Sequence, residues 1–323
     1  MQCTATDRRR FLKIAAGTLA AGWSAGQRST ASAAPASTAL HSIRLGGPIF
    51  NPSHDPEELA LAHVKLGYRA AYCPHVSLDD KQRIRDIARA FAKHGVMLAE
   101  VGRWVNLMEA DSGKRAENLK KVTDGLALAE AIGARCCVDI AGSFNPKVWF
   151  GPHPDNLSAR FLDAAVENAR KIIDAVQPRR AKFTYEVMGW ALPDSPDAYL
   201  KMIKAVDRPA FGVHLDPCNL VNTPGHFYDT TRLLNECFDK LGPWIVSCHA
   251  KDIGWSNPPE MQVHLVEVLP GTGVLDYATY LRRLASLPAD VPLMQEHLKT
   301  AEEYGKARQY IMATGTKAGV RFQ

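Results

Sequence analysis

The amino-acid sequence predicts a closed (β/α)₈ barrel that forms a single domain. Short β-branched or aliphatic runs alternate with amphipathic helical stretches along the chain, and eight such strand and helix pairs can be counted. No linker rich in Pro, Gly or Ser interrupts them, which favours one closed barrel. An open doubly wound sheet is the alternative, but it lacks its Gly-rich fingerprint, because the "GTG" at 271–273 does not open a helix directly after a strand.

The helices and strands are predicted from periodicity. In stretches such as "DPEELALAHVKLG" and "DKQRIRDIARAFAKHG", apolar residues recur three and four positions apart. Gly67, Gly95 and Gly133 follow three of these stretches, where a glycine commonly ends a helix. The segment 250–275 is predicted to be the longest irregular connection, and long loops at a barrel mouth often form lids or substrate walls. The eight predicted strands lie near residues 42–46, 69–74, 97–101, 135–141, 182–187, 211–216, 244–249 and 292–297.

Residues 1–33 are predicted to be a cleaved export signal, which leaves 34–323 as the barrel domain. The stretch "DRRRFLKIAAGTLAAGWSAG" joins Arg8 and Arg9 to a short apolar run and resembles a twin-arginine signal. Small residues then suit a signal peptidase that cuts before Ala34. A membrane anchor or a basic terminus is the alternative, but the run is shorter than the roughly 20 residues of a membrane span. We therefore expect a periplasmic protein that meets the twin-arginine translocase during export and has no stable membrane anchor.

Charge and cysteine content narrow the classes of function. The leader carries five basic side chains against one acidic one, so its removal lowers the formal net charge from +5 to about +1. Nothing downstream forms a basic stripe for a phosphate backbone, so we expect no nucleic-acid partner. The six cysteines that remain lie mostly in or beside apolar runs, which favours buried free thiols over disulfides. A domain of this size that folds before export does not need disulfides for stability.

Polar residues end four successive predicted strands, from the fifth to the eighth. Strand five ends in "FTYEVMGW" with Glu186, strand six in "FGVHLDPCN" with Asp216, strand seven in "IVSCHAKD" with His249, and strand eight in "PLMQEHL" with Glu296. In a (β/α)₈ barrel the C-terminal ends of the strands meet at the active-site mouth. Each residue alone also suits a plain structural role, as an ion-pair partner, a turn cap or a hydrogen-bonded His. One candidate at each of four consecutive strand ends favours a shared site.

Three carboxylates and one imidazole at a common mouth predict a bound divalent cation. Without one, the buried charges would repel and desolvate one another. One nitrogen and three oxygen donors are mixed but mostly hard ligands, which suits Mn²⁺ or Mg²⁺ and also allows Zn²⁺ or Co²⁺. We expect a single ion, Mn²⁺ first among these, held by Glu186, Asp216, His249 and Glu296.

After the leader, the sequence resembles the xylose isomerase-like TIM barrels, often called sugar phosphate isomerases/epimerases. The resemblance rests on the order Glu, Asp, His, Glu at strands five to eight and on the contexts "HLDPCN", "CHAKD" and "PGTGVLDY". It implies the same four metal ligands. In the keto-sugar epimerases of the family the two glutamates also transfer protons, which implies Glu186 and Glu296 as the acid/base pair.

Two positions depart from the family pattern. The tagatose-type epimerases place a His three residues after the ligand Asp and an Arg six residues after the ligand His, whereas this sequence has Asn219 and Trp255 there. These departures argue against a specific assignment to that epimerase group. The endonuclease IV branch uses the same His in a three-metal cluster, so its absence disfavours phosphodiester cleavage.

Further side chains are predicted to line the mouth and contact the substrate. Tryptophans among them would give an apolar wall for a sugar face. Lys251 is expected to pair with Asp252, with a role as a base or in polarising a carbonyl as the alternative. His214 lies two residues before Asp216 and shares its face in an ideal strand, with packing lower in the barrel as the alternative. The predicted substrate contacts are His75, Glu100, Trp104, Trp190, His214, Asn219, Lys251 and Trp255.

The sequence thus predicts a metal-dependent isomerase or epimerase of a non-phosphorylated sugar. A metal that chelates a carbonyl and the neighbouring hydroxyl stabilises an enediolate, and carboxylates on opposite faces move the proton. A sugar phosphate is disfavoured, because export removes the protein from cytoplasmic metabolites and no phosphate-binding turn follows strands seven and eight. A lyase or hydrolase that cleaves oxidised (keto) glycosides is the first alternative, since the same intermediate can expel a β-substituent. A non-catalytic periplasmic sugar-binding protein is the second, and a homo-oligomer is left open.

Overall fold

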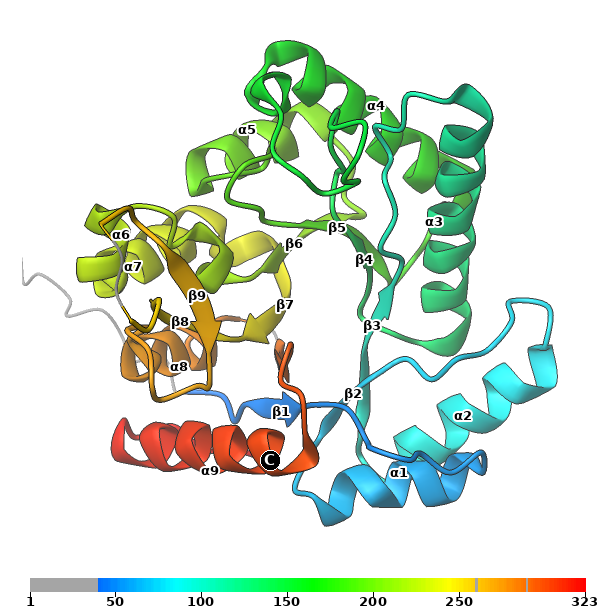
Figure 1. Cartoon of the computed structure of the whole chain (residues 1–323). Coiled ribbons are helices and arrows are strands. Elements are labelled where there is room, and N and C mark those ends of the chain that lie inside the picture. Colours follow the sequence, from blue (N-terminus) through cyan, green and yellow to red (C-terminus); the bar gives the residue numbers. More distant parts are fainter. Residues whose placement is uncertain (1–39, 259–260, 289) are drawn as a thin grey trace, which may run out of the picture. The chain divides into compact units, whose positions relative to one another are not determined.

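The computed structural model describes residues 40–258, 261–288 and 290–323. Within them, eight parallel strands close into a barrel in the order β1-β10-β7-β6-β5-β4-β3-β2, and the helices lie around its outside (Figure 1). The predicted (β/α)₈ barrel is therefore confirmed. The barrel strands are β1 (Arg44–Gly46), β2 (Ala70–Tyr72), β3 (Met97–Gly102), β4 (Cys136–Asp139), β5 (Lys182–Glu186), β6 (Phe211–Leu215), β7 (Ile245–Ala250) and β10 (Pro292–Gln295).

The helices begin and end at the residue types that satisfy free backbone groups. In α3, for example, the Asp111 carboxylate accepts a hydrogen bond from the Lys114 backbone N–H, and Gly133 closes the helix with a φ of 81°, a conformation that favours glycine. The α-helices are α1 (Pro56–Lys65), α2 (Lys81–Lys93), α3 (Ser112–Ile132), α4 (Ala159–Val176), α5 (Pro196–Val206), α6 (Pro224–Tyr228), α7 (Thr230–Leu241), α8 (Tyr277–Ala285) and α9 (Ala301–Lys317); the 3₁₀ helices are η1 (Pro154–Leu157), η2 (Pro217–Leu220) and η3 (Gly242–Trp244).

The predicted export signal, residues 1–33, lies outside the described residues. Among the helices that the structure describes, none combines the length and the apolar character that crossing a membrane requires.

A small apolar layer fills the lower part of the barrel interior. Met294 of β10 packs there with Ala70 and Ala99, and all three are fully buried. A Cβ on Gly46 would lie only 2.5 Å from the Met294 sulfur, so this position in β1 needs glycine. Because side chains two residues apart share a face of a strand, Glu296 follows Met294 on the inward face, one layer closer to the mouth.

The segment 250–275, predicted to be irregular, contains an antiparallel hairpin. Its strands are β8 (Asp252–Trp255) and β9 (Leu265–Val268). The side chain of Asp252 holds the hairpin to the following loop, because its carboxylate accepts hydrogen bonds from the backbone N–H groups of Ile253, Gly271, Gly273 and Leu275 at 2.9–3.1 Å. The expected pair of Lys251 with Asp252 is therefore wrong, since the Asp252 carboxylate is committed to these backbone groups.

The six cysteines within the described residues are free, as predicted. Five are buried and Cys73 is half-buried. Burial raises the pKa of the Cys73 thiol to about 12, so it stays protonated and unreactive at neutral pH.

Asp252→Asn tests the role of this carboxylate in holding the hairpin. Replacing one carboxylate oxygen by an NH₂ group places donors opposite backbone donors, so we expect the free energy of unfolding to fall by about 2–3 kcal/mol. Urea denaturation followed by circular dichroism measures it. Asp163→Asn on the exposed face of α4 is the control and should change stability by no more than about 0.5 kcal/mol. Equal effects of the two substitutions would contradict the assigned role.

Candidate metal centre

Four side chains from four neighbouring strands converge at the mouth of the barrel. Glu186 is the last residue of β5, Asp216 directly follows β6, His249 lies in β7, and Glu296 directly follows β10. Each offers one donor atom, and the four atoms lie within 4.8 Å of one another. The structure thus brings together the four residues that the sequence places at the strand ends.

The Nδ1 atom of His249 lies among three carboxylate oxygens. It is 3.0 Å from Glu296 Oε2, 3.1 Å from Glu186 Oε1 and 3.6 Å from Asp216 Oδ2. One Nδ1 atom carries at most one proton, so it cannot donate to three acceptors. Separations of about 3 Å match neighbouring ligands of a cation with bonds of about 2.1 Å.

The surroundings of two of these oxygens indicate whether a cation fits between them. Asp216 Oδ2 and Glu296 Oε2 are buried and accept no hydrogen bond of regular geometry, and their close neighbours are the charged groups of Lys251 and His249. The other Asp216 oxygen accepts the Cys218 backbone N–H at 3.0 Å, which fixes Oδ2 toward the centre. Three oxygens and one nitrogen around a common point fit a divalent cation, and these four residues would hold it.

The ammonium group of Lys251 lies directly beside the four residues. This side chain is 3% exposed, and burial alone would lower its pKa, but the surrounding carboxylates raise that pKa well above its usual value. In the cation-free protein Lys251 is therefore a cation and a hydrogen-bond donor. Its Nζ lies 2.9 Å from Asp216 Oδ2, 3.0 Å from Asn219 Oδ1, 3.1 Å from Glu267 Oε1 and 3.4 Å from Glu296 Oε2.

The two glutamates of the centre have pKa values shifted in opposite directions. Burial and the nearby charge of Glu296 raise the pKa of Glu186, despite the opposing effect of His249. Burial also acts to raise the pKa of Glu296, but His249 and Lys251 outweigh it and lower the value to about 2. Burial acts to lower the pKa of His249, and the charges of Glu296, Glu100 and Glu186 instead raise it well above its usual value.

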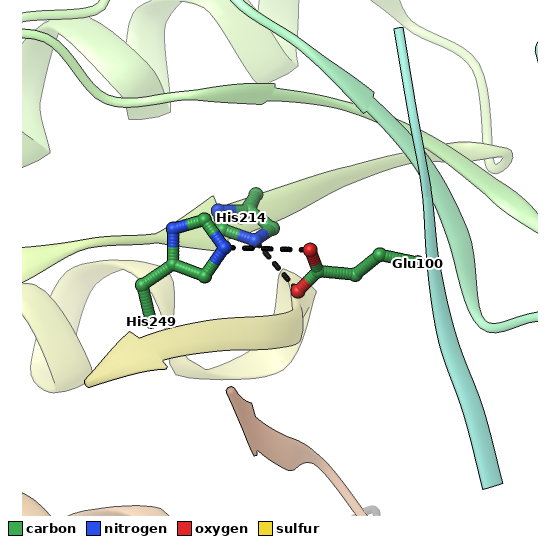
Figure 2. A group of neighbouring side chains, drawn as sticks. All are labelled: Glu100, His214 and His249. Carbon is green, nitrogen blue, oxygen red and sulfur yellow. Dashed lines mark hydrogen bonds and ion pairs between the residues drawn. The ribbon is translucent and has the colours of Figure 1, made fainter. Parts of the chain in front are cut away.

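A second buried group lies behind His249, one layer deeper in the barrel (Figure 2). Glu100 of β3 is 1% exposed, and its carboxylate lies between two imidazoles, 2.9 Å from His214 Nε2 and 3.4 Å from His249 Nε2. The Ser247 hydroxyl also donates to Glu100. In the barrel order, β3 lies directly opposite β7, so Glu100 spans the interior.

This arrangement places Glu100 away from its predicted position and decides between the two expected for His214. Glu100 was expected to contact substrate at the mouth, and His214 either to do so or to pack lower in the barrel, but they are 1% and 0% exposed and bond to each other beneath His249, so His214 takes the lower position. Glu100 is placed to accept the Nε2–H of His249, so that Nδ1 is the nitrogen that faces the carboxylates and offers its lone pair once its own proton is displaced. Glu100, His214 and His249 also have donor atoms close enough for an ion, but hydrogen bonds already link these atoms.

A cavity of about 400 Å³ opens above the centre. Of the predicted substrate contacts, Trp104, Trp190, Asn219 and Lys251 line it, together with Glu186 and Glu296. Asn219 Nδ2 also donates to Glu186 Oε1 at 3.1 Å, so this residue orients a member of the centre. The remaining lining residues are Ile140, Trp149, Phe150, Met188, Glu267 and His297.

Two predicted contacts lie elsewhere. His75 is exposed and lines two larger hollows, of about 820 and 640 Å³, that include no residue of the centre. Trp255 lies in β8, where its ring packs against Phe227 at 5.8 Å between centroids, so it is not part of the cavity wall. We therefore assign the candidate site to the smaller cavity, because its lining includes residues of the centre and the linings of the two larger hollows do not.

Sequence reasoning missed six residues of this cavity, of which Ile140 and Met188 are apolar and four are charged or aromatic. Glu267 pairs with both Lys251 and His297, and the strand-like alternation of "HLVEV" was the available signal for it. His297 lies shortly after β10 and has a φ of 61°, a backbone conformation that the sequence does not indicate for a histidine. Trp149 and Phe150 form a short aromatic run in the loop after β4 that fits no helix, which was a usable signal for a mouth residue.

The family model of the xylose isomerase-like TIM barrels matches residues 59–314. The chain belongs to this family. Most of the solved structures that resemble this chain are enzymes of the xylose isomerase-like superfamily. No curated protein sequence matches the chain.

Three solved structures illustrate the range of this fold. A xylose isomerase-like TIM barrel protein from Mycobacterium smegmatis in complex with magnesium is 19% identical, with a TM-score of 0.61 over 85% of this chain and 97% of that chain. 3-Keto-D-glucoside 4-epimerase from E. coli is 13% identical, with a TM-score of 0.59 over 84% and 99%. Endonuclease IV from Thermus thermophilus is 15% identical, with a TM-score of 0.62 over 85% and 99%. Identities this low show a shared fold alone.

Glu100→Gln tests the contact behind His249. The neutral amide is a weaker acceptor for the His249 Nε2–H, so we expect the affinity for Mn²⁺ to fall about 10- to 100-fold while the fold is retained. Isothermal titration calorimetry measures the affinity, and ¹⁵N chemical shifts of His249 report its tautomer. Glu117→Gln on the exposed face of α3 is the control. Unchanged affinity and tautomer in Glu100→Gln would rule out this contact as a determinant of binding.

The raised pKa of His249 predicts that metal binding depends on pH. Below that pKa the imidazole of the cation-free protein is protonated, and an incoming ion must displace the proton. We expect the affinity for Mn²⁺ to rise about tenfold per pH unit between pH 6 and 8, with about one proton released per ion. Calorimetry in buffers of different ionisation enthalpy counts the protons. A binding enthalpy that is independent of the buffer would contradict the prediction.

Proposed function

We propose that this protein is a divalent-metal-dependent sugar isomerase or epimerase that moves a proton next to a carbonyl group. The observation that carries the proposal is the convergence of Glu186, Asp216, His249 and Glu296 on one point beneath a small-molecule cavity. Membership of the xylose isomerase-like family supports it, as does the fold shared with a sugar epimerase. Because an endonuclease shares the fold as well, the donor set and not the fold selects the chemistry.

Glu186 and Glu296 are the proposed proton-transfer pair. They reach the centre from β5 and β10, which two other strands separate in the barrel, so a substrate between them has a carboxylate on either side. In the cation-free protein the pKa of Glu186 is raised and that of Glu296 is lowered, so the two carboxylates differ in their affinity for a proton, as the members of an acid and base pair do. An acid and a base on opposite faces are what an epimerisation requires.

The other residues of the cavity bind and orient the sugar in this proposal. When bound, a divalent ion supplies Lewis-acid stabilisation of the negative charge that develops on the substrate oxygens. The fixed positive charge of Lys251 can donate to the same oxygens, and Asn219 orients Glu186. Mn²⁺ is the first candidate for the ion, with Mg²⁺, Co²⁺ and Zn²⁺ as alternatives.

A lyase or hydrolase of oxidised (keto) glycosides is the second candidate. The observation that favours it is that the cavity continues past the centre along Trp149, Phe150 and Trp190, where a group attached to the sugar would fit. A non-catalytic sugar-binding protein would be expected to lack part of the donor set, whereas all four donors are in place.

Export through the twin-arginine pathway to the periplasm is part of the same proposal. Folding before export would let a weakly held Mn²⁺ be bound where Cu²⁺ and Zn²⁺ do not outcompete it. Signal cleavage before Ala34, read from the N-terminal sequence of the secreted protein, tests it.

Glu186→Gln tests the proposed chemistry. We expect exchange of a carbon-bound proton with D₂O in candidate keto- and aldo-sugars to fall about 100- to 10,000-fold, because the amide can neither deliver a proton to the substrate nor take one from it. Proton NMR follows the exchange, and metal analysis of the same samples counts bound ions; Glu117→Gln is the control. Full exchange in Glu186→Gln, or purified native protein that binds no divalent ion, would refute the proposal. Release of the aglycone from a 3-keto-glucoside, with no isomerisation of free sugars, would promote the lyase.

A further inference from the structure

The cavity above the metal centre has two chemically different sides. One side carries the charged residues Lys251, Glu267 and His297. The other side carries aromatic rings from three successive loops, those that follow β3, β4 and β5. We call these rings the aromatic wall, which consists of Trp104, Trp149, Phe150 and Trp190.

The aromatic wall leaves an unusual amount of ring surface in contact with solvent. Its four side chains are 37–43% exposed, although each is large and apolar. Single exposed aromatic residues are normal, but several that line one cavity beside a polar centre mark a ligand-binding surface.

Polar side chains, of which Ser143 and Asn156 are buried, hold the loop that presents Trp149 and Phe150. Ser143 Oγ donates to the Gly151 carbonyl, and Asn156 Nδ2 donates to the same carbonyl at 3.1 Å. Asn145 Oδ1 accepts the backbone N–H groups at positions 147 and 148, both at 2.9 Å. The two exposed rings are therefore fixed in place by the fold, which reduces the entropy that a ligand loses on binding them.

The wall offers few hydrogen-bonding groups to a ligand. The indole N–H of Trp190 already donates to the Phe150 carbonyl at 2.5 Å, which leaves the indole N–H groups of Trp104 and Trp149 as the side-chain donors of the wall. Ile140, directly after β4, and Met188, shortly after β5, add apolar side chains to the same lining. A second sugar ring placed there would lose water from its hydroxyl groups while gaining few partners, whereas an aromatic ring loses little and stacks on the indoles.

We propose that the substrate is an aryl glycoside, whose sugar lies at the metal centre and whose aromatic aglycone lies against the aromatic wall. This inference rests on the proposed function for the placement of the sugar. It adds that Trp149 and Phe150, with Trp104 and Trp190, determine specificity by binding the part of the substrate that does not react. Binding energy from such a part positions the sugar between Glu186 and Glu296.

The test is equilibrium binding to the Mn²⁺-loaded protein, which needs no turnover. Phenyl β-D-glucoside, methyl β-D-glucoside and cellobiose are titrated separately by calorimetry. We expect the phenyl glucoside to bind at least about tenfold more tightly than the other two. Trp149→Ala, or the milder Phe150→Leu, should remove most of this preference by weakening the binding of the phenyl glucoside more than that of the methyl glucoside.

Tyr228→Ala is the matched control, because Tyr228 is an aromatic side chain that is 77% exposed on α6 and does not line the cavity. Equal affinities for the phenyl and methyl glucosides, or no saturable binding of the phenyl glucoside, would overturn the inference. Tightest binding of cellobiose would assign the wall to a second sugar and overturn it as well. A protein that prefers the phenyl glucoside but exchanges no protons keeps this inference and loses the proposed function.

Discussion

Repulsion among three buried carboxylates around one imidazole nitrogen is the constraint on which the rest of the site depends. Glu186, Asp216 and Glu296 approach His249 Nδ1 to 3.0–3.6 Å inside a barrel whose walls are apolar. Such a group is stable only with compensating positive charge. Lys251 supplies one part from the side, and the donor geometry suits a divalent ion for the other. The polar residues around the centre, such as Lys251, Asn219 and Glu100, pair with these charged groups and so stabilise them inside the barrel.

The repeating geometry of the barrel made the fold and the four central residues predictable from sequence. Parallel strands all end at the same mouth, so a polar residue at the end of an apolar run has only one region to enter. This is why Glu186, Asp216, His249 and Glu296 could be placed together before any coordinates. Prediction was weaker one layer down, because period-two alternation gives the same face to His214 and Asp216 without saying which of them is covered by the other.

The contacts that sequence did not predict depend on loops and on long-range pairing. Lys251 and Asp252 are neighbours with opposite charges, yet Asp252 bonds to backbone groups up to 23 residues later, and this leaves Lys251 for the centre. The positions of Trp149 and Phe150 follow from hydrogen bonds of Ser143 and Asn156 to the loop between them. Pairings of this kind depend on how distant loops fold back, and local periodicity carries no information about them.

The side chain of Glu100 crosses the barrel interior and connects the candidate metal centre to strands on the other side of the barrel. Its carboxylate joins β3 to β6 and β7 through two imidazoles, one of which also faces the cation ligands. The imidazole that would bind an ion at the rim therefore also belongs to a brace between opposite strands. The candidate metal centre and a strand residue 149 positions earlier in the chain share this one side chain.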